Sequence, residues 1–583
     1  MKKRVFYLLM AVAFLSSCKK QQDVFQPYSN TTVPVKLGEG TLSTDSIQWN
    51  NVYVAQTHEL FYTKMGKSAS VINKLDYSDG TFKGLETIQF PEGIPHTDIY
   101  LDEKGEFMLF SSLMPEFEGD TISDWNIWKS IRKGGKWQDP DLFYGGEVEE
   151  NLFYPWLTAS GNLYFSLTPH ESRNSDLYVS KLINGEYQKP EALPKYINSQ
   201  KLEGDAFIAP DESYLIFAGF ERGQNIGKSD LYISYNMDGT WSAPVWLGDK
   251  INSDGYDGSP FVTQDGKYLI FTSSRDSTDD DTFFNHYIVP FDSGKFKDTS
   301  LRLENYLVNV GVTPIRLEVD NLTTSGVEYG GSLSMKNGEI FYTRATEDFS
   351  ERQITRSRFV NGIFSEPERV KIGGEYYTDA SDVQITENGD YLYFKMRGNV
   401  PDDVSRRDGN IWRSKSENGV WSKAELLPSE INSELSEYYP MITNSGNLYF
   451  SREYEDTSYD IYVSRFEDGK YQEAERLPNH INTNLLESDA YVSPDETYMV
   501  FVRMYAEEGL GVSDLYISFQ EDNAWSHPKN MRSLNSNGVD GSPFVTADGK
   551  YLIFTSTRDS ENPEVFDGHL DIYAVRFDKN NWK

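Results

Sequence analysis

Short β-branched and aromatic runs, separated by turn residues, recur along the chain at a nearly constant spacing. In one repeat, Ser259-Pro-Phe-Val-Thr263 and Lys267-Tyr-Leu-Ile-Phe-Thr272 flank Asp265-Gly266, a dipeptide suited to a tight hairpin turn. The last Phe of this hairpin recurs ten times, with steps of 49 to 56 residues inside each half of the chain. These positions are Phe61, Phe110, Phe165, Phe217, Phe271, Phe341, Phe394, Phe450, Phe501 and Phe554. The pattern predicts an all-β chain of ten repeated units, and no helical periodicity of useful length follows the leader.

Each unit holds four short strands. After the hairpin, a third strand is clearest as Asp230-Leu-Tyr-Ile-Ser234, and a fourth follows a turn as Trp241 to Leu247. Four strands in a period of about 40 to 50 residues are typical of β-propeller blades. The segments 257–276 and 540–559 are almost identical, which indicates that a half of five blades was duplicated as a whole.

The ends of the two halves predict how the rings close. The last unit stops after the strand that begins at Asp571 and lacks a fourth strand, whereas Pro34-Val-Lys-Leu37 and Pro314-Ile-Arg-Leu317 each stand alone in front of a half. We expect each orphan strand to complete the last blade of its own half, because a closed ring leaves no long exposed sheet edge. The prediction is two tandem five-bladed β-propellers at residues 33–291 and 314–583, joined by a linker at 292–313. A single ten-bladed ring is the alternative, but the interval of 70 residues between Phe271 and Phe341 favours two rings.

Two segments carry a family resemblance. Ala209-Pro-Asp-Glu-Ser-Tyr-Leu-Ile-Phe217 and Ser493-Pro-Asp-Glu-Thr-Tyr-Met-Val-Phe501 resemble the WD-like Pro-Asp repeat of TolB-type propellers. The resemblance covers nearly the whole chain after the leader and implies protein–protein interaction at the cell envelope, without catalysis. TolB-type rings are typically six-bladed, so six-bladed rings are a further alternative to the count of five.

The N-terminus resembles a bacterial lipoprotein signal. Met1-Lys-Lys-Arg4 is a basic start, Val5 to Leu15 is apolar but too short to anchor in a bilayer, and small residues precede Cys18, the only cysteine in the chain. We expect residues 1–17 to be a signal peptide, Cys18 to be lipidated, and the polar residues 18–32 to be a tether. This predicts an anchored lipoprotein of the envelope, at the outer membrane and on its periplasmic or surface face.

The formal net charge of −35 limits the partners. Such a surface repels nucleic acid and anionic membranes, so we expect no nucleic-acid partner and membrane contact through the lipid anchor alone. We expect the partner to be an envelope protein or a glycan.

The first strand of each blade lines the central channel, so its opening residues form a ring. When the units are aligned, Asn51 in the first half and Gly331 in the second share one level of the channel with two Asp, one Tyr and one Ser of the same half. Further carboxylates stand two residues before this level in several units. The candidate ligand-binding residues are Asp98, Tyr154, Glu203, Asp205, Asp257 and Ser259 in the first half, and Asp382, Glu437, Tyr439, Glu487, Asp489, Asp540 and Ser542 in the second. The same residue types also suit a structural role, because Asp and Ser at a strand start bond to backbone N–H groups and hold blades together.

These residues favour binding over catalysis. Carboxylates at a channel mouth can bind a hard cation such as Ca²⁺, or they can bind sugar hydroxyls beside a Tyr face. We expect no other cofactor, because the seven histidines show no metal-ligand spacing. The sequence predicts a non-catalytic envelope lipoprotein that acts as a protein- or glycan-binding propeller scaffold. The alternative is a glycoside hydrolase with a pair of channel carboxylates, although carboxylates at equivalent repeat positions are poorly suited to distinct acid and base roles.

Overall fold

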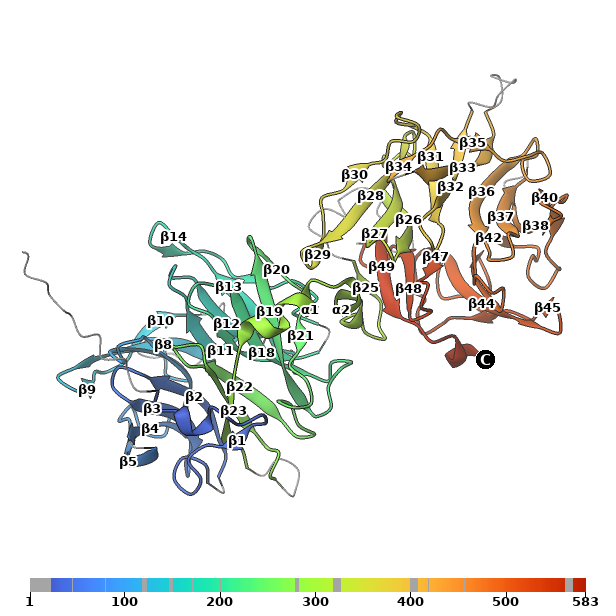
Figure 1. The fold of residues 1–583 in the computed structure, drawn as a ribbon. Helices are drawn as coiled ribbons and strands as arrows, with labels where there is room; N and C mark the ends of the chain where they lie inside the picture. Colours follow the sequence, from blue (N-terminus) through green and yellow to red (C-terminus); the bar gives the residue numbers. More distant parts are fainter. Residues whose placement is uncertain are drawn as a thin grey trace, which may run out of the picture.

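The computed structural model describes residues 23–583 except 45, 79, 118–122, 146–149, 170–171, 173, 200, 278–282, 318–326, 399–406, 418, 455–457 and 561–569. The described chain forms two rounded all-β bodies with short helices between them (Figure 1). Each body contains five antiparallel sheets of four or five strands. The two bodies are five-bladed β-propellers, as predicted.

The strands of the first propeller repeat in a fixed order from the channel outward. The inner strands are β2 (Gln48–Val54), β6 (His96–Leu101), β11 (Glu150–Leu157), β17 (Glu203–Ile208) and β22 (Asp257–Val262). The second strands are β3 (Glu59–Met65), β7 (Phe107–Ser112), β12 (Leu163–Pro169), β18 (Tyr214–Phe220) and β23 (Tyr268–Ser273). The third strands are β4 (Ser70–Ser78), β8 (Asn126–Lys133), β13 (Asp176–Ser180), β19 (Ser229–Met237) and β24 (Asn285–Pro290). The outer strands are β5 (Thr81–Thr87), β10 (Asp141–Tyr144), β16 (Glu191–Ala192), β21 (Val245–Trp246) and β1 (Val35–Lys36). Short hairpin strands extend three blades as β9 (Lys136–Trp137), β14 (Leu182–Ile183), β15 (Glu186–Tyr187) and β20 (Thr240–Trp241).

The second propeller repeats this order. Its inner strands are β26 (Val327–Ser334), β31 (Ala380–Ile385), β36 (Ser436–Ile442), β42 (Leu486–Val492) and β47 (Asp540–Val545). Its second strands are β27 (Glu339–Ala345), β32 (Tyr391–Arg397), β37 (Leu448–Glu453), β43 (Tyr498–Met504) and β48 (Tyr551–Ser556). Its third strands are β28 (Arg352–Val360), β33 (Gly409–Glu417), β38 (Tyr459–Ser464), β44 (Ser513–Glu521) and β49 (Asp571–Arg576). Its outer strands are β30 (Glu368–Arg369), β35 (Glu425–Leu426), β41 (Glu475–Arg476), β46 (Lys529–Asn530) and β25 (Ile315–Arg316). The extending strands are β29 (Ile363–Phe364), β34 (Val420–Trp421), β39 (Phe466–Glu467), β40 (Lys470–Tyr471) and β45 (Ala524–Trp525).

Each ring closes on itself. β1 pairs with β24, and β25 pairs with β49, so each orphan strand completes the last blade of its own half. The inner strands contact one another in the order β2, β6, β11, β17, β22 and back to β2, and those of the second ring close in the same way. The single ten-bladed ring is thereby excluded.

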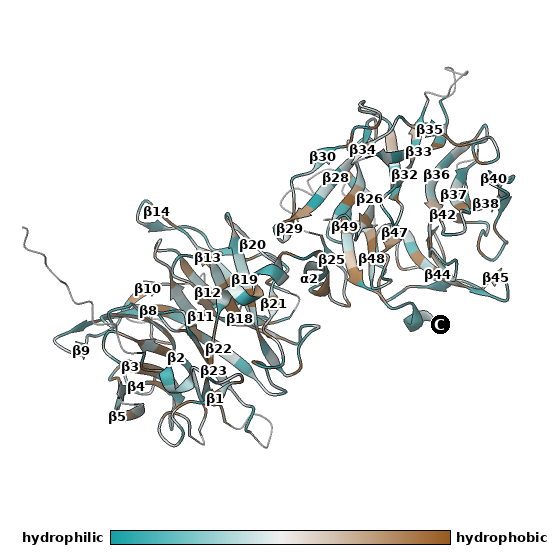
Figure 2. Cartoon of the chain, in the orientation of Figure 1, coloured by the Kyte–Doolittle hydropathy of each residue, from teal (hydrophilic) through white to brown (hydrophobic). Residues whose placement is uncertain are grey.

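The cores lie inside the blades. The ten recurring Phe side chains are all buried, and in Figure 2 the apolar colour follows the strands while many connecting loops are hydrophilic. The N-terminal segment differs from the prediction of a free tether, because Phe25 is buried against Tyr53 and Tyr77 at ring centroid distances of 4.9 and 5.0 Å. Apolar Val24, Phe25 and Tyr28, with the short helix η1 (Gln26–Tyr28), dock on the first ring.

Short helices connect the rings, although the sequence shows no helical periodicity there. They are η2 (Ser293–Phe296), α1 (Lys297–Ser300) and α2 (Leu303–Val308). Tyr306 of α2 packs between Tyr196 of the first ring and Phe364 of the second, at 6.1 and 5.5 Å. Asn309 Nδ2 donates to the Pro244 carbonyl at 3.0 Å. The connecting segment is therefore packed against both rings.

Candidate ligand-binding cavity

Every inner strand carries a β-bulge, and one residue of the bulge adopts the left-handed backbone conformation with a positive φ. The strand register shifts at this point in all ten inner strands. The left-handed residues are Asn50, Asp98, Tyr154, Asp205 and Ser259 in the first ring, and Gly330, Asp382, Tyr439, Asp489 and Ser542 in the second. In the first blade of each ring, the bulge residue is Asn50 or Gly330, one residue before the predicted Asn51 and Gly331. A bulge re-aims its side chain, and bulky residues such as Tyr154 and Tyr439 rarely adopt this conformation.

In the first ring, the bulge residues Asp205 and Asp98 accept hydrogen bonds from residues on the inner strands. Asp205 accepts hydrogen bonds from the Ser259 backbone N–H at 2.9 Å and from the Tyr256 hydroxyl at 2.5 Å. Asp98 accepts from Thr97 Oγ1 at 2.8 Å and Trp49 Nε1 at 3.2 Å. Burial, and next the charge of Asp205, raise the pKa of Asp98 to about 7. Ser259, Tyr256 and Trp49 belong to blades next to those of Asp205 and Asp98, so these bonds tie neighbouring blades together.

The second ring repeats this arrangement with a cation added. Ser542 Oγ donates to Asp489 at 2.9 Å, and the Tyr439 hydroxyl donates to the Pro543 carbonyl at 2.7 Å. Burial, and next the charge of Asp382, raise the pKa of Asp489 to about 6. Lys395 is buried near Asp382, and burial lowers its pKa to about 8.

The carboxylates predicted two residues before the bulge do not line a channel mouth. Each is fully buried and paired with an arginine of the adjoining strand or the loop after it. The pairs are Glu203–Arg222 at 2.8 Å, Asp257–Arg275 at 2.8 Å, Glu437–Arg452 at 2.9 Å, Glu487–Arg503 at 2.8 Å and Asp540–Arg558 at 2.7 Å. The Arg503 guanidinium also lies over the Tyr516 ring at 4.8 Å. Each carboxylate balances the charge of an arginine inside its blade, so these five residues stabilise the blades.

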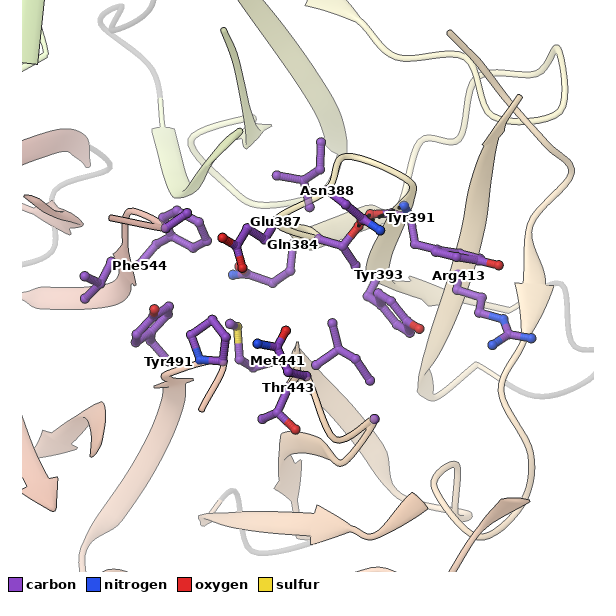
Figure 3. Close-up of a pocket in the computed structure, with 18 of the residues that line it drawn as sticks. Gln384, Glu387, Asn388, Tyr391, Tyr393, Arg413, Met441, Thr443, Tyr491 and Phe544 are labelled. Atoms are coloured by element: carbon purple, nitrogen blue, oxygen red, sulfur yellow. Dashed lines mark hydrogen bonds between the residues drawn. The ribbon is translucent and has the colours of Figure 1, made fainter. Parts of the chain in front are cut away.

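An open cavity of about 710 Å³ lies at the other end of the second channel, where the inner strands finish. Its floor is formed by four side chains, each two residues after the bulge residue of its strand. They are Gln384, Met441, Tyr491 and Phe544. Figure 3 shows Gln384 and Glu387 facing Tyr491 and Met441 across this space. None of the predicted residues Asp382, Tyr439, Asp489 and Ser542 is among the lining residues. The predicted residues lie one level below the floor.

The first ring fills the same level with aromatic rings. The residues two positions after its bulges are Tyr100, Trp156, Phe207 and Phe261. Trp156 contacts Tyr100 at 5.2 Å and Phe207 at 4.9 Å, and Phe207 contacts Phe261 at 6.1 Å. Gln384 and Met441 replace Tyr100 and Trp156 in the second ring, and these smaller side chains leave the cavity open.

One wall of the cavity is aromatic. It holds Tyr391, Tyr393, Phe466 and Tyr471 from blades two and three, with the Phe466 ring 5.0 Å from that of Tyr471. Arg413 lies beside Tyr391 at 5.8 Å and donates to Glu425 at 2.9 Å. The flat faces of Tyr and Phe bind apolar surfaces of a ligand, while the hydroxyls accept or donate hydrogen bonds.

Polar groups of the hairpin loops and strand ends complete the cavity. The Gln384 amide is almost fully buried and makes no hydrogen bond within the described structure. Asn388 Nδ2 donates to Asp390, and Lys336 Nζ donates to the Asn388 carbonyl. Glu387 is exposed and is the one carboxylate among the lining residues. A largely preformed concave site with a few placed polar groups is typical of a ligand site.

The sequence contains a signal for this cavity. The cavity arises where the two halves differ, not at the residues that recur between them. Two residues after the bulge, Gln384 of the second half stands where the first half has Tyr100, and Met441 stands where it has Trp156.

The described residues contain no group of three His, Cys, Asp or Glu side chains placed to hold a metal ion. Ca²⁺ binding at a channel mouth, which the sequence allows, finds no support from such a group among these residues. The predicted signal peptide and Cys18 lie outside the described residues. No helix among the described residues is long and apolar enough to cross a membrane.

Comparisons with known proteins add little. No protein-family model and no curated protein matches the sequence. Among solved structures, TolB from Acinetobacter baumannii is 13% identical over 71% of this chain and 78% of its own, with a TM-score of 0.21. The α-L-arabinofuranosidase from Lactobacillus brevis is 10% identical over 45% of this chain and 94% of its own, with a TM-score of 0.31. The tricorn protease is 10% identical over 93% of this chain and 58% of its own, with a TM-score of 0.27. TM-scores this low carry no argument about function.

Proposed function

We propose that the protein is a non-catalytic, lipid-anchored binding protein of the bacterial envelope, and that its second propeller binds a glycan or a protein segment at the channel mouth. The open cavity over Gln384 and Met441 carries this proposal, because its volume of about 710 Å³ lies in the range of ligand sites. The first propeller, with Trp156 packed among other rings at the same level, acts as a scaffold.

The carboxylates support binding rather than hydrolysis. A glycoside hydrolase commonly needs two carboxyl groups facing one bond of its substrate, and among the described residues that line the cavity only Glu387 carries one. Asp382 and Asp489 lie below the floor, where Ser381 and Ser542 bond to them. The alternative, a hydrolase with a channel carboxylate pair, would have to reach these buried groups.

The proposed anchor is the lipidated Cys18, in a TolB-like envelope lipoprotein. Asp23 already belongs to the segment that docks on the first ring through Phe25. Four residues lie between Cys18 and Asp23, and the five Cα-to-Cα steps span at most about 18 Å when fully extended. The first ring would therefore sit close to the membrane surface. Labelling with a fatty acid should fail in a Cys18→Ala variant, and labelling that persists would remove the anchor from the proposal.

A variant that places the tryptophan of the first ring at the matching position of the second ring tests the binding site. Met441→Trp should fill the cavity and remove retention of an envelope glycan or protein, whereas Trp156→Phe at the matched position of the first ring should leave it intact. Pull-downs from envelope extracts and a glycan array would measure both. Retention that survives Met441→Trp in a folded protein would overturn the proposed site. Glycan turnover that Glu387→Gln abolishes would instead establish the hydrolase.

A further inference from the structure

A second cavity continues the first along the surface of the second ring. Its volume is about 690 Å³, and it lies between the hairpin loops of blades four and five and the C-terminal helix η3 (Lys579–Trp582). Five residues line both cavities: Glu387, Asn444, Tyr491, Pro494 and Ala547. Because these residues are shared, the two cavities form one groove that runs from the channel mouth toward the C-terminus. We call it the blade groove.

The lining of the blade groove combines uncharged polar groups with charged ones. Ser493, Thr546 and Asn580 line the second part, and Gln384, Thr443 and Asn444 line the first part or the junction. Amide and hydroxyl side chains both donate and accept hydrogen bonds. The aromatic faces of Tyr391 and Tyr393 stand at the far end of the first cavity. This combination suits a ligand that carries many hydroxyl groups on apolar ring faces.

Several charged groups along the groove contact other groups of the protein, whereas Arg576 and Glu387 make no ion pair with described residues. Lys550 pairs with Asp548 at 3.3 Å, and Arg413 donates to Glu425 at 2.9 Å. Lys579 lies over the Tyr498 ring at 4.8 Å and donates to Thr497 at 3.3 Å. Asp578 accepts from the Asn580 backbone N–H at 3.0 Å. A strongly charged ligand would have to compete with these partners, so the groove favours a neutral one.

We propose that the blade groove binds a neutral oligosaccharide chain, one end of which enters the cavity over Gln384 while the chain extends past Glu387 to η3. The inference rests on the proposed function and adds the class and length of the ligand. Glu387 lines both cavities and makes no ion pair or hydrogen bond with described residues, so its carboxylate is free to accept from sugar hydroxyls at the junction. A single sugar would leave the second cavity unused, whereas a chain fills both.

The test uses affinity electrophoresis on soluble neutral arabinan, xylan, mannan and β-glucan, followed by calorimetry with a length series of oligomers from the polymer that is retained. Affinity should rise with chain length until the groove is filled. Asn580→Trp, at an exposed position in the second cavity, should lower affinity for long oligomers about tenfold, roughly 1.4 kcal/mol, and leave short oligomers unchanged. Lys295→Trp, on the corresponding helix η2 of the first ring, is the matched control and should have no effect.

The outcomes separate this inference from the proposed function. Affinity that does not grow with length, or that ignores Asn580→Trp, would overturn the extended groove while leaving the cavity site standing. Retention of an envelope protein that Met441→Trp removes, without retention of any of the polysaccharides, would overturn the glycan and keep the binding site. Binding that is indifferent to both Met441→Trp and Asn580→Trp would overturn both proposals.

Discussion

Trp156 of the first propeller and Met441 of the second stand at the same position in the third blade of their rings, two residues after the left-handed bulge residues Tyr154 and Tyr439. Trp156 packs against Phe207 at 4.9 Å, whereas Met441 lines a cavity of about 710 Å³. This level is therefore packed with aromatic rings in the first propeller and borders a cavity in the second.

This relationship predicts unequal costs of truncation. Trp156→Ala removes a ring from a packed aromatic cluster and should lower the free energy of unfolding by about 3–5 kcal/mol. Met441→Ala removes a side chain that already faces the cavity, so we expect a loss below about 2 kcal/mol. Urea denaturation of the two variants measures the difference. Equal losses would mean that the Met441 level is packed as tightly as that of Trp156.

The buried pair Glu487–Arg503 should be essential for stability. Glu487→Gln leaves the Arg503 guanidinium buried without its counter-charge, and breaking such a pair costs about 3–5 kcal/mol. Glu387→Gln, on the exposed hairpin, is the control and should leave the unfolding midpoint unchanged. A stable Glu487→Gln variant with altered ligand binding would return Glu487 to the candidate site.

Asp98 should make the first ring less stable as the pH rises. Its pKa in the folded chain is about 7, above the value of about 3.9 in an unfolded chain, so the fold favours the protonated form. This contribution is fully present below about pH 4 and is lost as the pH rises through 7. Asp98→Asn should reduce the fall in unfolding free energy between these pH values, and exposed Asp141→Asn should not. Identical pH profiles for wild type and Asp98→Asn would contradict the raised pKa.

The contacts of Tyr306 with both rings should make the two rings unfold together. Its ring lies 6.1 Å from Tyr196 and 5.5 Å from Phe364, so Tyr306→Ala removes contacts to both propellers. We expect calorimetry to resolve two transitions in this variant, closer to the behaviour of independent domains. A single unchanged transition would show that other contacts couple the rings. Val312→Ala, an exposed position near the same connection, is the control.

The sequence predicts the architecture well because the repeat pattern is local. The recurring Phe, the Asp-Gly turns and the orphan strands at Pro34 and Pro314 each fix a strand or a closure, and β1 and β25 pair as expected. The sequence does not reveal the short helices between the rings, because α2 is held by tertiary contacts of Tyr306 and Asn309 and its six residues are too few to show a helical period.

The candidate site was harder to predict for a different reason. Carboxylates such as Glu203 and Asp540 recur because each holds an arginine inside its own blade, so their recurrence indicates packing and not binding. The cavity depends on the volume left by Gln384 and Met441, which follows from how side chains fill the channel in space. The hairpin of Phe466 and Tyr471 reaches the cavity from the outer end of blade three, a contact that the strand pattern alone does not reveal.

The most direct measurement is a crystal structure of the full chain soaked with the longest oligosaccharide that calorimetry shows to bind. The account predicts density in the second ring alone, in contact with Glu387 and Tyr393 and continuing toward Asn580. Density in the first ring near Trp156, or on an outer blade surface with the cavity empty, would contradict it.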